Sequence, residues 1–247
     1  MLVDTHCHIH EADYPDGASA LERARKAGVE KLICVGTDNT TSLEAANFAS
    51  IQDGVFFSVG AHPHDSKDGY VQIEQIAKQK SEKLVAIGEI GLDYFYAHSP
   101  REIQIKAFEA QLQLAVDGNL PVIFHVREAF DDFWPIFNNF RGLRGVLHSF
   151  TDSRENMQKG IAEGLFIGVN GISTFARDKQ EMWDTVPLEK MVLETDAPFL
   201  TPAPYRGKVN EPAFVRNVAE YHATRRGVEL EHLARVTSAN ASTLFSI

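Results

Sequence analysis

Two histidines near the N-terminus, His6 and His8, alternate with small or apolar residues. In a β-strand, residues two apart point to the same face, so both imidazoles leave the strand on one side, one pleat apart. Such a pair can hold one metal ion, because zinc, manganese and similar ions readily accept neutral imidazole nitrogen. Two strand histidines that only form hydrogen bonds give the same pattern, so the rest of the chain has to supply the other ligands.

More histidines stand at or just after the ends of predicted apolar strands, in parts of the chain far apart in sequence. They are His62, His64, His125 and His148. In a parallel barrel the carboxyl ends of the strands share one rim, and that rim carries the active site. One strand-end histidine is usually structural, whereas these four together with His6 and His8, from several units far apart in sequence, indicate a shared site.

Three carboxylates follow the same placement: Glu89, Glu194 and Asp196. A lone acid in an apolar strand is costly to bury in its charged form without a partner. We interpret Glu89 and Asp196 as metal ligands. For Glu194, an ordinary salt bridge or a supporting role is an equally good interpretation.

Six candidate ligands result: His6, His8, Glu89, His125, His148 and Asp196. They are too many for one tetrahedral zinc with an open position. They suit two divalent ions about 3.5–4 Å apart, with a bridging carboxylate and a bridging hydroxide. Such a pair fits hydrolysis of a phosphate ester or an amide. Mixed histidine and carboxylate sites tolerate several ions, so Zn, Mg and Mn all remain candidates.

Apolar runs of strand length alternate with stretches of helical spacing along the chain. The strand runs are 2–9, 31–36, 55–60, 84–88, 121–126, 145–150, 165–169 and 191–194. The helical stretches are 18–27, 41–49, 71–79, 101–116, 127–140, 153–163 and 177–186, with two closing helices over 211–226 and 229–245. Strands that are apolar throughout, each followed by a helix, indicate a covered parallel sheet.

Eight such units in 247 residues predict a closed α/β fold, a (β/α)8 TIM-type barrel, as one domain over residues 1–247. The alternative is an open doubly wound sheet, which would gather the ligands at one switch point. Three glycines that follow helical stretches are predicted to be helix C-caps: Gly28, Gly118 and Gly164. The pairs Thr40–Thr41 and Asp152–Ser153 suit helix starts.

The composition, 44% hydrophobic and 23% charged, is that of an ordinary globular protein. The net charge of -10 disfavours a broad DNA-reading surface or a polybasic membrane patch, but not a small phosphate site beside bound cations. Cys7 and Cys34 stand in separate apolar runs and are expected to be reduced. No run approaches the roughly 20 apolar residues of a membrane span. We therefore expect a cytoplasmic protein with no membrane and no obligate protein partner.

Taken in order, the motifs of the chain resemble those of the TatD-type deoxyribonuclease family, among the amidohydrolase-like metal-dependent hydrolases. The motifs that carry the resemblance are Asp4–His8, Gly60–Pro63, Gly88–Tyr94, Pro121–Arg127, His148–Thr151, Glu194–Pro198 and Pro204–Pro212. The resemblance implies a TIM-type barrel with two divalent ions. It implies these ligands: His6, His8 and Asp196 on one ion, His125 and His148 on the other, and Glu89 as the bridge.

Further residues are candidates for substrate contacts: His62, Asp93, Tyr94, Arg127, Arg206 and Lys208. His62 suits contact with a substrate phosphate or leaving group. Arg127, like the basic loop around Arg206, suits phosphate binding, with a salt bridge or an ordinary surface loop as the alternative. Asp93 and Tyr94 suit either substrate positioning or hydrogen bonds that orient a metal ligand.

Three functions are consistent with these residues. The first is a phosphodiesterase, a 3′-end-directed DNase on single-stranded DNA, in which a metal-bound hydroxide attacks phosphorus and Asp196 and Glu89 are catalytic. Tyr94, Phe95 or Tyr205 would then stack on a base of the entering strand end. The second keeps the site but hydrolyses a small amide, lactone or phosphoester, and the third is a non-catalytic metal-binding protein. Glu89 stands where a carboxylated lysine would have favoured the second.

Overall fold

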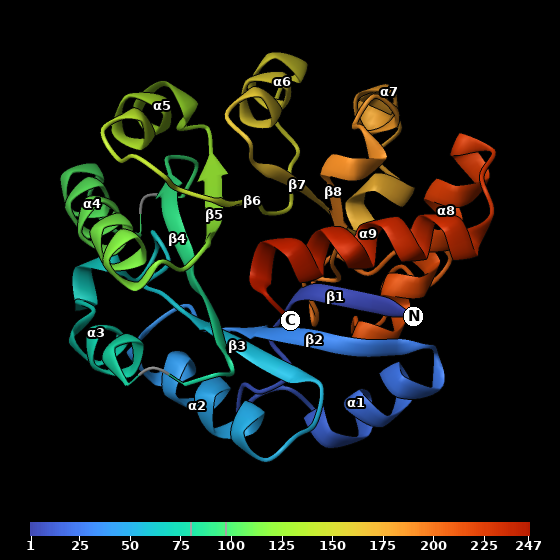
Figure 1. Ribbon diagram of the computed structural model, residues 1–247, viewed down its shortest axis with the longest axis horizontal. Coiled ribbons are helices and arrows are strands. Elements are labelled where there is room, and N and C mark those ends of the chain that lie inside the picture. The colour runs from blue at the N-terminus through green and yellow to red at the C-terminus, as the bar shows by residue number, and fades with distance from the viewer. Residues whose placement is uncertain (80, 97) are drawn as a thin grey trace. The chain divides into compact units, whose positions relative to one another are not determined.

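The computed structural model describes residues 1–79, 81–96 and 98–247. Strands and helices alternate along it, as the colours of Figure 1 show. The strands are β1 (Leu2–Cys7), β2 (Val29–Val35), β3 (Val55–Val59), β4 (Leu84–Asp93), β5 (Val122–Arg127), β6 (Gly145–Leu147), β7 (Phe166–Val169) and β8 (Met191–Leu193).

The helices follow the strands along the chain. The α-helices are α1 (Gly17–Lys26), α2 (Asn39–Ser50), α3 (Val71–Lys78), α4 (Arg101–Gly118), α5 (Phe130–Asn138), α6 (Arg154–Ala162), α7 (Gln180–Asp184), α8 (Val215–Arg226) and α9 (Leu230–Phe245). Short 3-10 helices are η1 (Ser66–Asp68), η2 (Gly171–Thr174), η3 (Arg177–Lys179), η4 (Leu188–Lys190) and η5 (Pro212–Phe214).

The eight strands neighbour one another in chain order, from β1 to β8. The strand pairs whose register is described are parallel. An open doubly wound sheet would instead reverse its strand order at a switch point. The predicted (β/α)8 fold class is therefore confirmed, and the open-sheet alternative is wrong.

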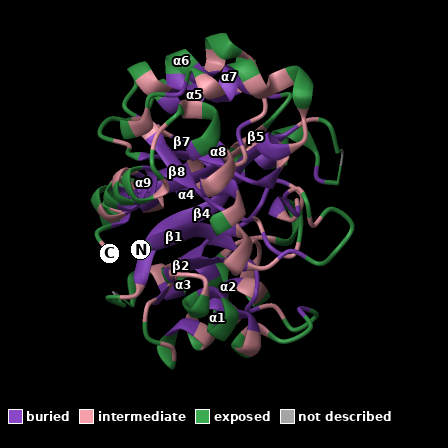
Figure 2. Ribbon diagram, turned by 90° about the vertical axis from the view of Figure 1, so that its right-hand side faces the viewer, coloured by how far each residue is buried: buried purple, intermediate pink, exposed green. Residues whose placement is uncertain are grey.

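The strands are largely buried because most of their residues are apolar on both faces. Every residue of β1 and β4 is buried, and Figure 2 shows exposed residues mainly on helices and loops. A parallel strand covered by helices has no solvent face, which is why these runs show little polar alternation. A polar side chain in such a strand therefore needs a partner within the protein.

The chain divides into two compact units. The first unit comprises Met1–Cys34 and Ser149–Ile247, and the second comprises Val35–His148. That residues 1–247 act as one domain stays a prediction.

In the first unit, α9 packs against β1 and β8 and buries Leu233, Leu244 and Phe245. In the second unit the core is aromatic: Phe124 of β5 lies 5.3 Å from Phe133 of α5, between ring centroids. These large side chains fix the helices against the strands, since an aromatic pair adds stability beyond the area that it buries.

Several element boundaries differ from the sequence prediction. Strand β4 continues to Asp93, so Glu89 lies inside the strand and not at its end. The continuation is possible because Gly91 lets β4 approach β5 closely. A Cβ at Gly91 would lie 1.9 Å from the carbonyl oxygen of His125. Because β5 continues to Arg127, the helix predicted over 127–140 begins only at Phe130.

The helix ends also differ in part. Helix α4 ends with Asn119 in the left-handed conformation (φ 50°), so Gly118 is not the C-cap that we predicted. Asn tolerates this conformation because its short polar side chain bonds locally. Helix α2 is capped by Asp38, which accepts from the backbone of Thr41 in a capping box. Ser153 caps α6 as expected.

Cys7 and Cys34 are buried free thiols, as predicted. Among the residues that the structure describes, no helix combines the length and the apolar character needed to cross a membrane. The cytoplasmic location stays a prediction.

His222 on α8 is a buried histidine outside the candidate ligands. Its Nε2 lies 2.8 Å from Ser173 Oγ, which itself donates to the carbonyl oxygen of Asn170. The ring therefore uses its one proton toward Ser173, and a second proton on Nδ1 would have no acceptor among the described residues. Burial, with the nearby Arg226 charge, lowers the pKa of His222 to about 3.

This lowered pKa predicts a pH-dependent stability. Below its unfolded pKa of about 6.5, His222 binds a proton more readily in the unfolded chain, so stability is lost as the pH falls from 6.5 toward 3. In urea denaturation with chelator present, the free energy of unfolding of His222→Asn should fall less steeply with decreasing pH than that of the wild type. The difference in slope should approach about 1.4 kcal/mol per pH unit. Equal slopes would contradict the prediction, and His232→Asn, at an exposed position on α9, is the matched control.

Candidate metal centre

The first unit holds a cluster of two histidines and one carboxylate, here called the His6 cluster (His6, His8 and Asp196). The Nε2 atoms of His6 and His8 lie 3.1 Å apart, and Asp196 Oδ1 lies 3.6 Å from the first and 3.4 Å from the second. Both imidazoles are buried. Two imidazole nitrogens converging on one carboxylate oxygen form a donor set that suits a divalent ion.

Backbone pairing between β1 and the segment after β8 brings this cluster together. The amide of Asp196 donates to the carbonyl oxygen of His6 (2.8 Å), and the amide of His8 donates to that of Ala197 (2.7 Å). Asp196, in the segment after β8, adopts a left-handed conformation (φ 59°). The predicted same-side placement of His6, on β1, and His8, directly after it, is thus combined with a carboxylate from the segment after β8.

Asp4 supports the His6 cluster, a role that the sequence analysis missed. Its Oδ1 accepts from the backbone amides of Thr195 (2.9 Å) and His6 (3.3 Å), and its Oδ2 accepts from Thr195 Oγ1 (2.6 Å). Burial raises the pKa of Asp4 to about 8, although these hydrogen bonds act against the rise. One side chain therefore links β1 to the segment that carries Asp196. The available signal was an acid inside an apolar strand, two residues before a histidine.

His8 is held between two carboxylates. Its Nε2 faces Asp196, and its Nδ1 lies 3.3 Å from Glu11 Oε1. Burial acts to lower the pKa of His8, but the hydrogen bonds to Asp196 and Glu11 outweigh it, so the pKa lies well above its usual range. Without a metal the ring holds a proton at neutral pH, and ion binding has to release that proton.

The second unit holds the Glu89 cluster, in which three imidazoles surround one carboxylate: His62, His125 and His148 around Glu89. Glu89 Oε1 lies 2.7 Å from Nδ1 of His125, 3.7 Å from Nε2 of His62 and 3.8 Å from Nε2 of His148. These residues come from the carboxyl half of β4, from β5, and from the segments after β3 and β6. The chemistry of this donor set again suits a divalent ion.

Asp93 orients His125 within the Glu89 cluster. Its Oδ2 lies 3.0 Å from Nε2 of His125 and 3.0 Å from Nε2 of His64, while the other nitrogen of His125 faces Glu89. A histidine with one nitrogen on a carboxylate and the other on a ligand position is the usual arrangement at metal sites. Asp93 is fully buried, so its place favours orientation of a ligand over contact with substrate.

The proton states within the Glu89 cluster differ. Burial acts to lower the pKa of His125, but hydrogen bonds to Asp93 and Glu89 raise it to about 9. Burial alone would raise the pKa of Asp93, but the His125 hydrogen bond and others hold it below its usual range. Burial and the nearby His125 charge lower the pKa of His62, which is thus neutral, the form that ligates metal. We expected His62 to contact substrate, and the structure places it among the candidate ligands.

Tyr94 and Arg127 lie beside the Glu89 cluster but contact other groups. Tyr94 donates from its hydroxyl to Asp132 Oδ2 (2.6 Å), which also accepts from Arg101. Arg127 has its guanidinium 4.0 Å from the ring centroid of Phe95. Substrate contact by either residue stays a prediction.

Arg206 and Lys208 belong to the first unit, in the loop after β8. Arg206 donates to the carbonyl oxygen of Thr201 (2.9 Å) and covers the ring of Phe175. Lys208 Nζ lies 5.4 Å from the ring centroid of Tyr205. The two basic side chains of this loop thus each lie near an aromatic ring. Their role in phosphate binding stays a prediction.

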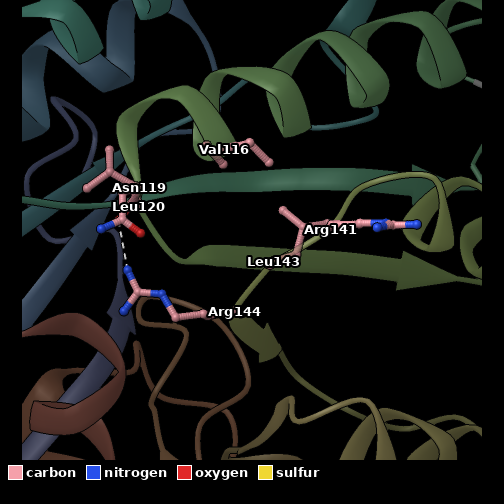
Figure 3. A pocket seen from close by; sticks show the side chains of 8 residues that line it. Val116, Asn119, Leu120, Arg141, Leu143 and Arg144 are labelled. Atoms are coloured by element: carbon pink, nitrogen blue, oxygen red, sulfur yellow. Dashed lines mark hydrogen bonds between the residues drawn. The ribbon is translucent and has the colours of Figure 1, made fainter.

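A cavity of about 190 Å³ lies at the other end of the strands in the second unit, away from the Glu89 cluster (Figure 3). It is lined by the end of α4 and by the segment before β6. Arg144 donates there to the carbonyl oxygen of Asn119 (2.7 Å) and so satisfies the end of α4. None of the predicted site residues lines this cavity.

Comparisons with known proteins agree with this donor chemistry. The family model described as TatD related DNase matches residues 3–246. The chain belongs to the TatD-related DNase family. In an alignment of 254 positions that covers 100% of both proteins, it is 37% identical to the "Uncharacterized metal-dependent hydrolase YabD" of Bacillus subtilis. This TatD-family chain is thus a metal-dependent hydrolase, as predicted.

Two further similarities extend this result. The TatD-family chain is 37% identical over 243 residues, 94% of each protein, to a Shigella flexneri protein named "3'-5' ssDNA/RNA exonuclease TatD". Its structure matches the crystal structure of YJJV, a TatD homolog from Escherichia coli K12, with a TM-score of 0.92 and 29% identity over 100% of this chain and 98% of the other. That match agrees with the TIM-type barrel class.

The link between Asp4 and Thr195 predicts a supporting role in metal binding. In Thr195→Val, Asp4 Oδ2 loses its hydroxyl donor, so β1 and the Asp196 segment are held less firmly. Loss of such a supporting hydrogen bond weakens metal affinity by about 10- to 100-fold. Titration calorimetry of the metal-free protein with Mn²⁺ measures this. Thr195→Ser keeps the hydroxyl and should bind like the wild type, and equal affinities for all three proteins would disprove the role.

The Asp93 contact with His125 makes a separate prediction for the Glu89 cluster. Asp93→Asn keeps the shape but removes the charge that orients His125, so one metal equivalent should bind about 10- to 100-fold more weakly. Asp132→Asn, in the same unit but paired with Tyr94 and Arg101, is the matched control. If both variants retained wild-type affinity by calorimetry, Asp93 would not orient a ligand.

Proposed function

We propose that this TatD-family hydrolase is a 3′-to-5′ exonuclease on single-stranded DNA that uses two divalent ions. The observation that carries the proposal is the likeness to exonucleases over nearly the whole chain. Proteins named "3'-5' ssDNA/RNA exonuclease TatD" from Shigella flexneri, Salmonella typhimurium and Pantoea vagans are 35–37% identical over 94% of this chain. The donor sets of the His6 and Glu89 clusters support one ion at each. That Glu89 bridges the two ions stays a prediction.

Bound divalent ions would supply the charge that activates water and neutralises the phosphate during hydrolysis. The chain's own groups would hold and orient the reactants. The Asp196 side chain remains 14% exposed while its Oδ1 faces two imidazoles, so it can accept a proton from a water molecule that enters from solvent. Glu89, with its side chain 5% exposed among three histidines, would serve as a ligand rather than exchange protons with solvent.

The substrate class follows from charge as well as from the relatives. A net charge of -10 disfavours binding of a long duplex through many lysine and arginine contacts. The end of a single strand presents one scissile phosphate and a few bases, which a local site can hold. A strand end is therefore the form of DNA that this protein suits best.

Metal-reloaded protein tests the proposal directly. Wild-type protein is stripped of metal, reloaded with Mg²⁺, Mn²⁺ or Zn²⁺, and incubated with single-stranded DNA labelled at either end. Shortening should proceed from the 3′ end. Glu89→Gln and Asp196→Asn should lower the rate by at least about a hundred-fold, because each removes charge at a metal position.

Glu155→Gln and Asp178→Asn, the same chemical changes at exposed positions, are the controls, with circular dichroism to check the fold. If the wild type degraded no DNA with any ion but hydrolysed a small chromogenic phosphodiester, the exonuclease proposal would be wrong. The earlier alternative of a small-ester hydrolase would then be favoured.

A further inference from the structure

Two aromatic side chains stand exposed directly after β4. Phe95 and Tyr96 are 50% and 42% exposed, and they follow Asp93 in the chain. Arg127, the last residue of β5, lies against them. We call these three residues the aromatic shelf (Phe95, Tyr96 and Arg127).

The shelf is an ordered arrangement of rings and a cation. The guanidinium of Arg127 lies 4.0 Å from the ring centroid of Phe95 and 4.8 Å from that of Tyr96. The two rings are 4.6 Å apart at 86°. Arg127 makes these contacts with aromatic faces rather than an ion pair with a carboxylate of the described residues. Its charge is therefore available to a ligand that lies on the shelf.

Asp93 ties the shelf to the Glu89 cluster. Its Oδ1 accepts from the backbone amides of Phe95 and Tyr96, each at 3.0 Å, while its Oδ2 contacts His125. Along β5, His125 and Arg127 are two residues apart, so they point to the same face about 7 Å from each other. The shelf thus lies one strand repeat beyond a candidate metal ligand, in the same unit.

We propose that the aromatic shelf is a stacking subsite for one unpaired base of the single-stranded substrate, next to the phosphate at the Glu89 cluster. This inference rests on the proposed exonuclease function. Aromatic faces bind any base through stacking, and a guanidinium adds cation–π attraction and charge for the adjacent phosphate. Such a subsite gives an acidic protein affinity for a strand end without many phosphate contacts.

Binding of a short oligonucleotide tests the subsite. The probe is a fluorescent thymidine pentamer whose 3′-terminal linkages are phosphorothioates, which keep the negative charge and resist hydrolysis, and its dissociation constant is measured by anisotropy on Mn²⁺-loaded protein. Phe95→Leu and Tyr96→Leu keep apolar bulk but lose the π-face. Each should raise the dissociation constant about 5- to 100-fold. Phe95→Trp keeps an aromatic face and should bind the probe like the wild type.

A probe with one abasic nucleotide separates stacking from a general effect on the fold. The abasic nucleotide is placed at each position of the probe in turn. At one of these positions, loss of the base should weaken binding to the wild type but change binding to Phe95→Leu by less than about two-fold. A matched control is Phe166→Leu, because Phe166 pairs with Lys190 in a cation–π contact at the amino end of β7. That variant should bind like the wild type, and the Mn²⁺ affinity of every variant is measured alongside.

The outcomes are distinct. If the wild type binds and shortens DNA but Phe95→Leu and Tyr96→Leu bind it equally well, the shelf is not a subsite and the exonuclease proposal stands. If the shelf variants bind weakly but lose as much affinity as the wild type at every abasic position, stacking is disproved. If the wild type neither binds nor degrades single-stranded DNA, both proposals are wrong.

Discussion

Buried acids in otherwise apolar strands are the groups on which each half of this protein's chemistry depends. Asp4 and Asp93 lie in strands that are otherwise apolar, where an unsatisfied acid would be costly. Asp4 satisfies its oxygens with the groups of Thr195 and His6, and Asp93 with His125, His64 and two backbone amides. Because these acids cannot move to solvent, Asp4 holds the backbone of β1 to the segment that carries Asp196, and Asp93 holds the ring of His125 in a fixed orientation. The candidate ligands are thus positioned by acids that are not ligands themselves.

The sequence predicted the parts of the site that depend on strand periodicity. The alternation of His6 and His8 was enough to predict that both imidazoles leave the strand on one side. The structure brings both beside Asp196 Oδ1, with His6 on β1 and His8 directly after it. Apolar runs followed by helical stretches were likewise enough to predict the (β/α)8 class, because each signal is local to a few turns or strand residues.

The remainder depends on contacts between strands, which no local pattern records. The extension of β4 past Glu89 requires Gly91 to lie opposite His125, a matter of register between two strands. The loop sequence around His62 does not record whether its side chain faces substrate or Glu89. Tyr94 and Phe95 are adjacent in sequence, yet one hydroxyl bonds Asp132 while the neighbouring ring lies under Arg127. Side-chain direction at the end of a strand is decided by the partners it meets.

Protons and metal ions compete for the same atoms in both clusters. His8 and His125 each lie between carboxylates, which favour a proton on the ring in the absence of metal. His62 is kept neutral by burial and by the charge on His125. The hydrogen bond from His125, with others, holds the pKa of Asp93 below its usual range, so Asp93 is ionised beside that ring. The acids that hold the histidines in place therefore also set the proton cost of loading the metal.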